Sequence, residues 1–145
     1  RSDAVSLVER LKRRRPEIAI GADLIAGFPT ENEAHHTANL SIVRELGVVH
    51  GHVFPYSPRP GTPAARMPQV ARAAVKARAG ELRAAVADVR REWLDRQIGR
   101  PLLVLAEADG TGYAENFARA RLPAGTPRGA IVPITPTSIE EGLLA

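Results

Sequence analysis

The chain of 145 residues contains no cysteine. This excludes a disulfide framework, and it also excludes any zinc or iron–sulfur site held by cysteines within these residues. Aromatic residues make up only 4% of the sequence, and no apolar run approaches the roughly 18–20 residues of a membrane-spanning helix. The chain starts at Arg1 without the pattern of a signal peptide, so the cytoplasm is the expected location.

Apolar residues amount to 44% and charged residues to 25%, a balance typical of a folded globular protein. The net charge of +4 is unevenly distributed. Residues 66–100 contain nine Lys or Arg against four Asp or Glu, whereas residues 101–145 contain three against five. The basic segment fits a surface that faces phosphates, and it fits a solvated helix face equally well.

The first part of the chain alternates between helical and extended patterns. Residues 3–14 predict a helix with Asp3 as its N-cap, and residues 18–27 predict a strand that is buried on both faces. A second helix is expected over residues 30–46, followed by a strand over residues 48–54. Because short turns join these elements, they predict two parallel strands of an α/β sheet or (β/α) barrel.

Local signals mark the ends of the second helix and one polar position in the strand before it. Thr30 with Glu33 three residues later matches a capping box, and Gly47 is a suitable C-terminal stop. Asp23 is the acidic residue within an otherwise apolar strand, and burial of an unpaired carboxylate is costly. We therefore expect Asp23 to have a partner, either in a structural ion pair or in a hydrogen bond near a bound cofactor.

A stiff loop and a long helix follow. Residues 55–68 contain five prolines and a glycine, which exclude regular structure, and a loop of this length is usually functional. Residues 69–97 predict one helix with an apolar stripe that ends at Trp93.

The last 45 residues have the character of a small β-domain. Strands are predicted at residues 102–105 and 131–134, with a hairpin turn at Asp109-Gly110. Residues 113–122 are expected to be extended, and Phe117 is expected in the core rather than as a stacking platform. Short strands at roughly ten-residue spacing predict a small closed β-barrel.

Three stretches of the sequence resemble a known family. Residues 21–31 (GADLIAGFPTE) and 52–68 (HVFPYSPRPGTPAARMP) resemble two late-barrel strand motifs of the radical-SAM methylthiotransferases. The form HVFPYS is most similar to the branch that modifies threonylcarbamoyladenosine in tRNA. Residues 112–117 (GYAENF) resemble the TRAM domain of these enzymes, a small RNA-binding β-barrel.

The resemblance implies an α/β fold in three parts. These are the C-terminal part of a (β/α) radical-SAM barrel at residues 1–68, a linking helical segment at 69–98, and a TRAM-like all-β barrel at 99–145. The implied enzyme adds a methylthio group at C2 of N6-threonylcarbamoyladenosine beside the anticodon, and its partner is tRNA, with no membrane or DNA. Its cofactors are S-adenosyl-L-methionine and 4Fe-4S clusters. The cluster ligands would lie outside this chain, which alone would be inactive.

The resemblance also implies a set of cofactor contacts: Asp23, Ile25, Gly27, Ser57 and Arg59. Two structural alternatives stay open. Gly27 could serve only the turn after its strand, and the proline loop could only lock the barrel to the next helix. The four histidines lack a recognisable ligand spacing, so no metal site is expected.

The expected RNA contacts are Tyr56, Arg90, Tyr113, Arg119 and Arg121. Since the tail is slightly acidic, the basic helix is expected to contribute as much as the tail. Two other functions fit the same residues: a non-catalytic RNA-binding remnant, and a radical-SAM methylthiotransferase of another substrate branch.

Overall fold

A computed structural model describes residues 1–145, and these divide into two compact units. The first unit comprises residues 1–16 and 20–90 and contains a two-stranded parallel sheet with helices. The second comprises residues 17–19 and 91–145 and contains a six-stranded mixed sheet. The predicted α/β class is therefore confirmed.

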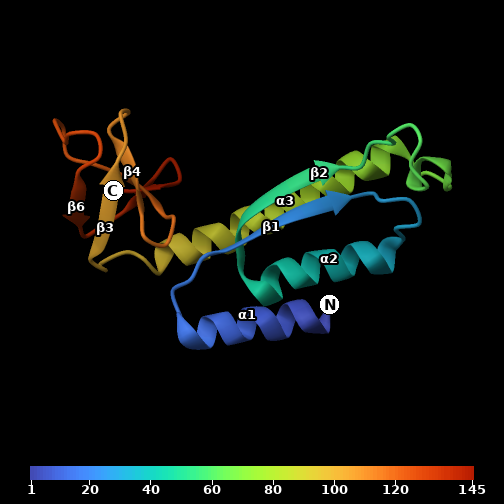
Figure 1. The fold of residues 1–145 in the computed structure, drawn as a ribbon, viewed down its shortest axis with the longest axis horizontal. Coiled ribbons are helices and arrows are strands. Elements are labelled where there is room, and N and C mark those ends of the chain that lie inside the picture. Colours follow the sequence, from blue (N-terminus) through green and yellow to red (C-terminus); the bar gives the residue numbers. More distant parts are fainter. The chain divides into compact units, whose positions relative to one another are not determined.

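The first unit follows the predicted order of helix, strand, helix and strand (Figure 1). Its elements are α1 (Ser2–Arg14), β1 (Ile20–Ala26), α2 (Glu33–Leu46) and β2 (Val48–Pro55). β1 and β2 are adjacent and parallel, and their register runs from the Ile20–Val48 pair to the Ala26–Pro55 pair. Because α2 connects two parallel strands, the carboxyl ends of both strands open on the same side.

The helices α1 and α3 form where the spacing of apolar residues predicted them. The N-cap position of α1 is Arg1, so the prediction of Asp3 as N-cap is wrong; Asp3 lies in the first turn, where its charge suits the helix dipole. After the short 3-10 helix η1 (Ala64–Arg66), α3 (Arg72–Asp95) is continuous, as predicted. No helix combines the length and apolar composition needed to cross a membrane.

The start of α2 differs from the prediction. Asn32 is the N-cap: its side chain accepts a hydrogen bond from the His35 N–H at 2.9 Å, and the Asn32 N–H donates to His35 Nδ1 at 3.4 Å. The predicted Thr30–Glu33 capping box is therefore wrong, because Thr30 lies in a left-handed turn at φ 74° two residues earlier. At the other end, Gly47 is the predicted stop, with φ 65°.

The prediction that the first strand is buried on both faces is wrong. Gly21, Asp23 and Ile25 are exposed in β1, whereas Ile20 and Ala26 are buried. The opposite face of the sheet packs on α3, since a Cβ added to the central glycine of β2 would lie 2.5 Å from a methyl group of α3. Within this chain, helices therefore cover one face of the parallel pair.

The sheet of the second unit has the strand order β6-β3-β4-β5-β8-β7. Its strands are β3 (Leu102–Ala106), β4 (Thr111–Ala114), β5 (Arg119–Arg121), β6 (Ile131–Ile134), β7 (Ile139–Glu140) and β8 (Leu143–Leu144). The predicted hairpin at Asp109-Gly110 is confirmed, because β3 and β4 pair as antiparallel neighbours around it. Val104, Ala118, Ala120 and Leu144 are fully buried and form much of this core.

A turn interrupts the segment that was predicted to be extended from residue 113 to 122. The Ala114 N–H donates to the Ala118 carbonyl at 2.9 Å, so β4 and β5 are separate antiparallel strands. Phe117 lies in this turn at φ 64° and is 65% exposed, which contradicts its predicted role as a core residue. The buried side chain here is Asn116, which accepts from the Ala118 N–H and donates to Gln97.

Candidate cofactor and RNA sites

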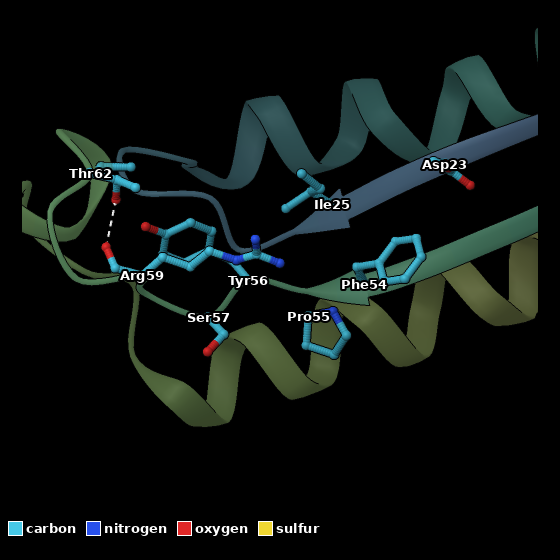
Figure 2. A pocket seen from close by; sticks show the side chains of 9 residues that line it. Asp23, Ile25, Phe54, Pro55, Tyr56, Ser57, Arg59 and Thr62 are labelled. Carbon is cyan, nitrogen blue, oxygen red and sulfur yellow. Dashed lines mark hydrogen bonds between the residues drawn. The ribbon is translucent and has the colours of Figure 1, made fainter.

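The carboxyl ends of β1 and β2 border an open hollow of about 540 Å³ (Figure 2). Five of its nine lining residues belong to the predicted sites: Asp23, Ile25, Tyr56, Ser57 and Arg59. The parallel register explains part of this gathering, since Asp23 pairs with His52 and Ile25 pairs with Phe54 on one face of the sheet. Two strand ends and the following loop therefore bring these side chains to one place.

Four lining residues were missed by sequence reasoning: Phe54, Pro55, Thr62 and Ala64. Phe54 is 52% exposed and lies beside Ile25, which is 53% exposed. Period-two alternation along the second strand was a signal that could have placed Phe54 on this face. Thr62 shapes the loop, because its hydroxyl donates to the Arg59 carbonyl at 2.8 Å (Figure 2).

Two opposite charges border the apolar part of this hollow. Asp23 is exposed on the open face of β1, so the expectation of a buried carboxylate is wrong. The physical reason is that the helix α3 covers the other face of the sheet. Arg59 is exposed in the loop, and its guanidinium makes no ion pair or hydrogen bond within the chain. Both charges can therefore contact a ligand.

Gly27 does not line the hollow and has structural roles instead. Its φ of 74° lies in the left-handed region, and an added Cβ would lie 2.5 Å from a methyl group of Val75 in α3. Its N–H donates to the Glu31 carboxylate at 3.1 Å. The turn and the close packing account for a glycine at this position without a ligand.

A largely buried ion pair that sequence reasoning missed holds the turn after β1. Glu31 Oε1 lies 3.1 Å from Nη1 of Arg78 in α3, and the two side chains are only 6% and 13% exposed. Arg78 also donates to the Glu31 carbonyl at 2.9 Å. Glu33 approaches the same guanidinium at 3.4 Å but is 81% exposed. No local pattern could predict the main pair, because its partners are 47 residues apart.

Tyr56 joins the proline loop to the strand ends. Its N–H donates to the Ala26 carbonyl at 2.8 Å, and its ring meets the Phe28 ring edge-on with centroids 5.3 Å apart. Its hydroxyl oxygen is buried and has no hydrogen-bond partner in the chain. Because buried hydroxyl groups are normally hydrogen-bonded, this oxygen is suited to a partner from outside the chain.

Arg90, a predicted RNA contact, has a partner within the first unit. Its Nη1 lies 3.1 Å from Nδ1 of His50. Burial lowers the pKa of His50 below its ordinary value, and the charges of Arg90 and His52 lower it further. The neutral imidazole can then accept the hydrogen bond from Arg90. This contact occupies part of the guanidinium that was expected to face RNA.

The predicted RNA contacts of the tail lie on neighbouring strands of the second unit. Tyr113 and Arg119 face each other across β4 and β5, with the guanidinium carbon 5.6 Å from the ring centroid. Arg119 pairs with Asp109 at 2.6 Å, and Arg121 pairs with Glu141 at 3.5 Å. Internal carboxylates therefore compete with phosphates for both tail arginines.

No protein-family model matches the chain. A threonylcarbamoyladenosine tRNA methylthiotransferase MtaB of Rickettsia prowazekii (strain Madrid E) is 38% identical over 144 residues, which cover 99% of this chain and 34% of that protein. Two tRNA-2-methylthio-N(6)-dimethylallyladenosine synthases match shorter stretches. That of Paracoccus denitrificans (strain Pd 1222) is 38% identical over 104 residues, and that of Ruegeria sp. (strain TM1040) is 41% identical over 106 residues.

These two matches cover 72% and 73% of this chain and 23% and 24% of the relatives. The chain thus spans about a third of the length of the Rickettsia relative and about a quarter of the other two. Similarity along almost all of the chain confirms the resemblance first noted in its strand motifs. The chain belongs to the radical-SAM methylthiotransferase family, and it corresponds to a part of those enzymes.

Proposed function

We propose that the chain forms the C-terminal part of a tRNA methylthiotransferase. In this proposal, residues 1–68 complete a radical-SAM barrel, residues 69–98 link it to the tail, and residues 99–145 form a TRAM-like barrel. The β1-α2-β2 unit supports the barrel assignment, since both carboxyl ends open on one side and one sheet face is exposed. Short, mostly antiparallel strands support the assignment of the tail.

The proposed reaction adds a methylthio group at C2 of N6-threonylcarbamoyladenosine in the anticodon loop of tRNA. It rests on one observation, the 38% identity over 99% of the chain to the Rickettsia enzyme of that name. A second candidate substrate is dimethylallyladenosine in tRNA, because two relatives with that activity in their names match 72% and 73% of the chain. The longer match favours the first substrate.

The groups around the hollow suit S-adenosyl-L-methionine. Ile25 and Phe54 offer apolar surface to an adenine ring, Arg59 can pair with a carboxylate, and Asp23 can accept from an ammonium or hydroxyl group. Ser57 adds a hydroxyl, whereas Gly27, the remaining predicted contact, lies outside the hollow. When bound, S-adenosyl-L-methionine supplies the radical chemistry of the reaction. The 4Fe-4S clusters of the family require cysteines outside this chain, which has none.

The residues of this chain would bind and orient the substrates. Arg59 would hold the cofactor carboxylate, while the proline-rich loop keeps its backbone fixed. Tyr56 would stack on a base or donate its buried hydroxyl to one. In the tail, Tyr113, Arg119 and Arg121 would contact RNA, and Arg90 would contribute from α3.

Nucleoside analysis tests this function directly. The gene is deleted, and tRNA nucleosides are measured by mass spectrometry. We expect 2-methylthio-N6-threonylcarbamoyladenosine to disappear while N6-threonylcarbamoyladenosine accumulates. Loss of the 2-methylthio derivative of dimethylallyladenosine instead would select the second substrate. Unchanged nucleosides would refute a methylthiotransferase function.

Complementation of the deletion strain tests the hollow. We expect Arg59→Ala to lower the modified nucleoside about tenfold, since a hydrogen bond to a charged group contributes about 1.5–3 kcal/mol. Arg66→Ala is the matched control, because Arg66 is exposed on η1 and does not line the hollow. Equal activity of both variants would show that Arg59 does not hold the cofactor.

A further inference from the structure

A second hollow lies on the other side of the proline loop, between that loop and the N-terminal half of α3. Its volume is about 670 Å³, larger than the hollow at the strand ends. From α3 it is lined by Arg72, Lys76 and Arg83 among small apolar residues, and from the loop by Tyr56 and Ser57. All of these residues belong to the first unit.

The charge around this hollow has one sign. No acidic residue lines it, and Arg72, Lys76 and Arg83 form no ion pair or hydrogen bond within the chain. They lie four and seven residues apart, which places them along one face of α3. By contrast, Arg78 of the same helix is paired with Glu31. A concave surface with several unpaired cations concentrates positive potential and attracts anions.

The two hollows share a wall. Pro55, Tyr56 and Ser57 line both of them, so a ligand in the basic hollow would lie across the loop from the proposed cofactor hollow. Tyr56 carries the buried hydroxyl without a partner, and Ser57 carries an exposed hydroxyl. The Ser57 hydroxyl can donate to a phosphate oxygen.

We propose that the basic hollow binds consecutive phosphates of an RNA strand and thereby holds the target nucleotide near the shared wall. The volume exceeds the needs of a single phosphate ion, and three unpaired cations suit a polyanion. This inference rests on the proposed tRNA-modifying function. It assigns RNA binding chiefly to Arg72, Lys76 and Arg83, whereas Arg90, Arg119 and Arg121 have internal partners.

The test measures binding of unmodified tRNA and of its anticodon stem-loop by the complete product of the gene, by fluorescence anisotropy over a range of salt concentrations. The variant carries Arg72→Gln, Lys76→Gln and Arg83→Gln. Each single-strand phosphate contact contributes about 0.7 to the slope of log K against log salt, so we expect the slope to fall by about 2 and affinity to fall about tenfold or more.

The matched control carries Arg10→Gln, Arg13→Gln and Arg14→Gln. These residues lie on α1 of the same unit, are exposed and have no ion pair, so the net charge changes equally without altering the hollow. We expect affinity to change less than about threefold in the control. Equal losses in both triple variants, or no loss in the first, would overturn the inference.

Inorganic phosphate and adenosine monophosphate serve as competitors. Displacement of the stem-loop by either at concentrations near those of the RNA would show a site for free phosphate compounds and would also overturn the inference. If the triple variant is unfolded by circular dichroism, Lys76→Glu replaces it with the same expected direction. Nucleosides unchanged on gene deletion, together with RNA binding that depends on these cations, would refute the proposed reaction but leave this site standing.

Discussion

The two sheets of this chain bury their side chains differently. In the second unit, Leu102, Val104 and Ala106 of β3 are buried and the side chains between them are exposed. This alternation is usual for an antiparallel sheet with one face in water. In the first unit, β1 and β2 are parallel, a class normally covered on both faces, yet Ile25 and Phe54 are about half exposed.

The parallel sheet of the first unit therefore differs from most parallel sheets, because one of its faces is exposed. An exposed face is ordinary in the tail, but in the parallel pair it coincides with the hollow that is lined by four of the five predicted cofactor contacts. The stabilising contacts differ as well. A largely buried ion pair stabilises the first unit, whereas the close approach of Gly112 to the Leu105 carbonyl and a buried Asn116–Gln97 hydrogen bond stabilise the second.

The largest expected effect lies in the tail. A Cβ added to Gly112 of β4 would lie 2.3 Å from the Leu105 carbonyl oxygen, which is backbone and cannot move aside. We expect Gly112→Ala to lower the free energy of unfolding by about 3 kcal/mol, measured by chemical denaturation. Gly80→Ala in α3 is the control: its added methyl meets nothing within 4 Å and should stabilise by about 0.5–1 kcal/mol. Equal changes in the free energy of unfolding for the two variants would show that close packing at Gly112 does not stabilise the tail.

The next effect concerns the ion pair of the first unit. Glu31→Gln removes the charge that Arg78 pairs with in a nearly buried site, and we expect a loss of about 2–3 kcal/mol in thermal or urea unfolding. Glu33→Gln changes an exposed carboxylate near the same guanidinium and should cost less than about 0.5 kcal/mol. A Glu33 effect as large as that of Glu31 would show that burial is not the deciding factor.

Two asparagines allow the units to be compared by the same substitution. Asn116→Ala removes a buried donor to Gln97 and a buried acceptor for the Ala118 N–H, so we expect a loss of about 2 kcal/mol. Asn32→Ala removes the N-cap of α2 and should cost about 1 kcal/mol. Hydrogen exchange should show that Asn116→Ala lowers amide protection in the tail and that Asn32→Ala lowers it in the α2 region. Losses shared by both regions would mean that the units unfold together.

The smallest effect is a pH dependence confined to the first unit. The pKa of His50 is lowered from its ordinary value of 6.5, chiefly by burial. Neutral His50 therefore stabilises the folded state fully at a pH above 6.5, and this stabilisation is lost as the pH falls toward the lowered pKa of the folded state. The melting temperature should therefore drop between about pH 7 and pH 5, and His50→Gln should flatten the drop. His52→Gln should retain most of it, because burial of His50 is unchanged. If His50→Gln left the pH dependence of the melting temperature unchanged, the titration of His50 would not be its cause.

The sequence by itself determined the elements that depend on short-range patterns. The βαβ order, the stop at Gly47, the hairpin at Asp109-Gly110 and the long helix α3 all follow from periodicity or from residues with special backbone preferences. The family resemblance of residues 21–31 and 52–68 named five of the nine residues that line the hollow at the strand ends. Their role in binding a ligand stays a prediction.

The tertiary structure alone decided features that depend on distant partners. Asp23 is exposed because helices cover just one side of its sheet, and Phe117 is exposed because it lies in the turn between β4 and β5 rather than in a strand. The pairing of Glu31 with Arg78 joins residues 47 positions apart, which no local pattern records. The absence of ion pairs at Arg72, Lys76 and Arg83 is likewise a property of the folded surface, because it depends on which carboxylates the fold brings near them.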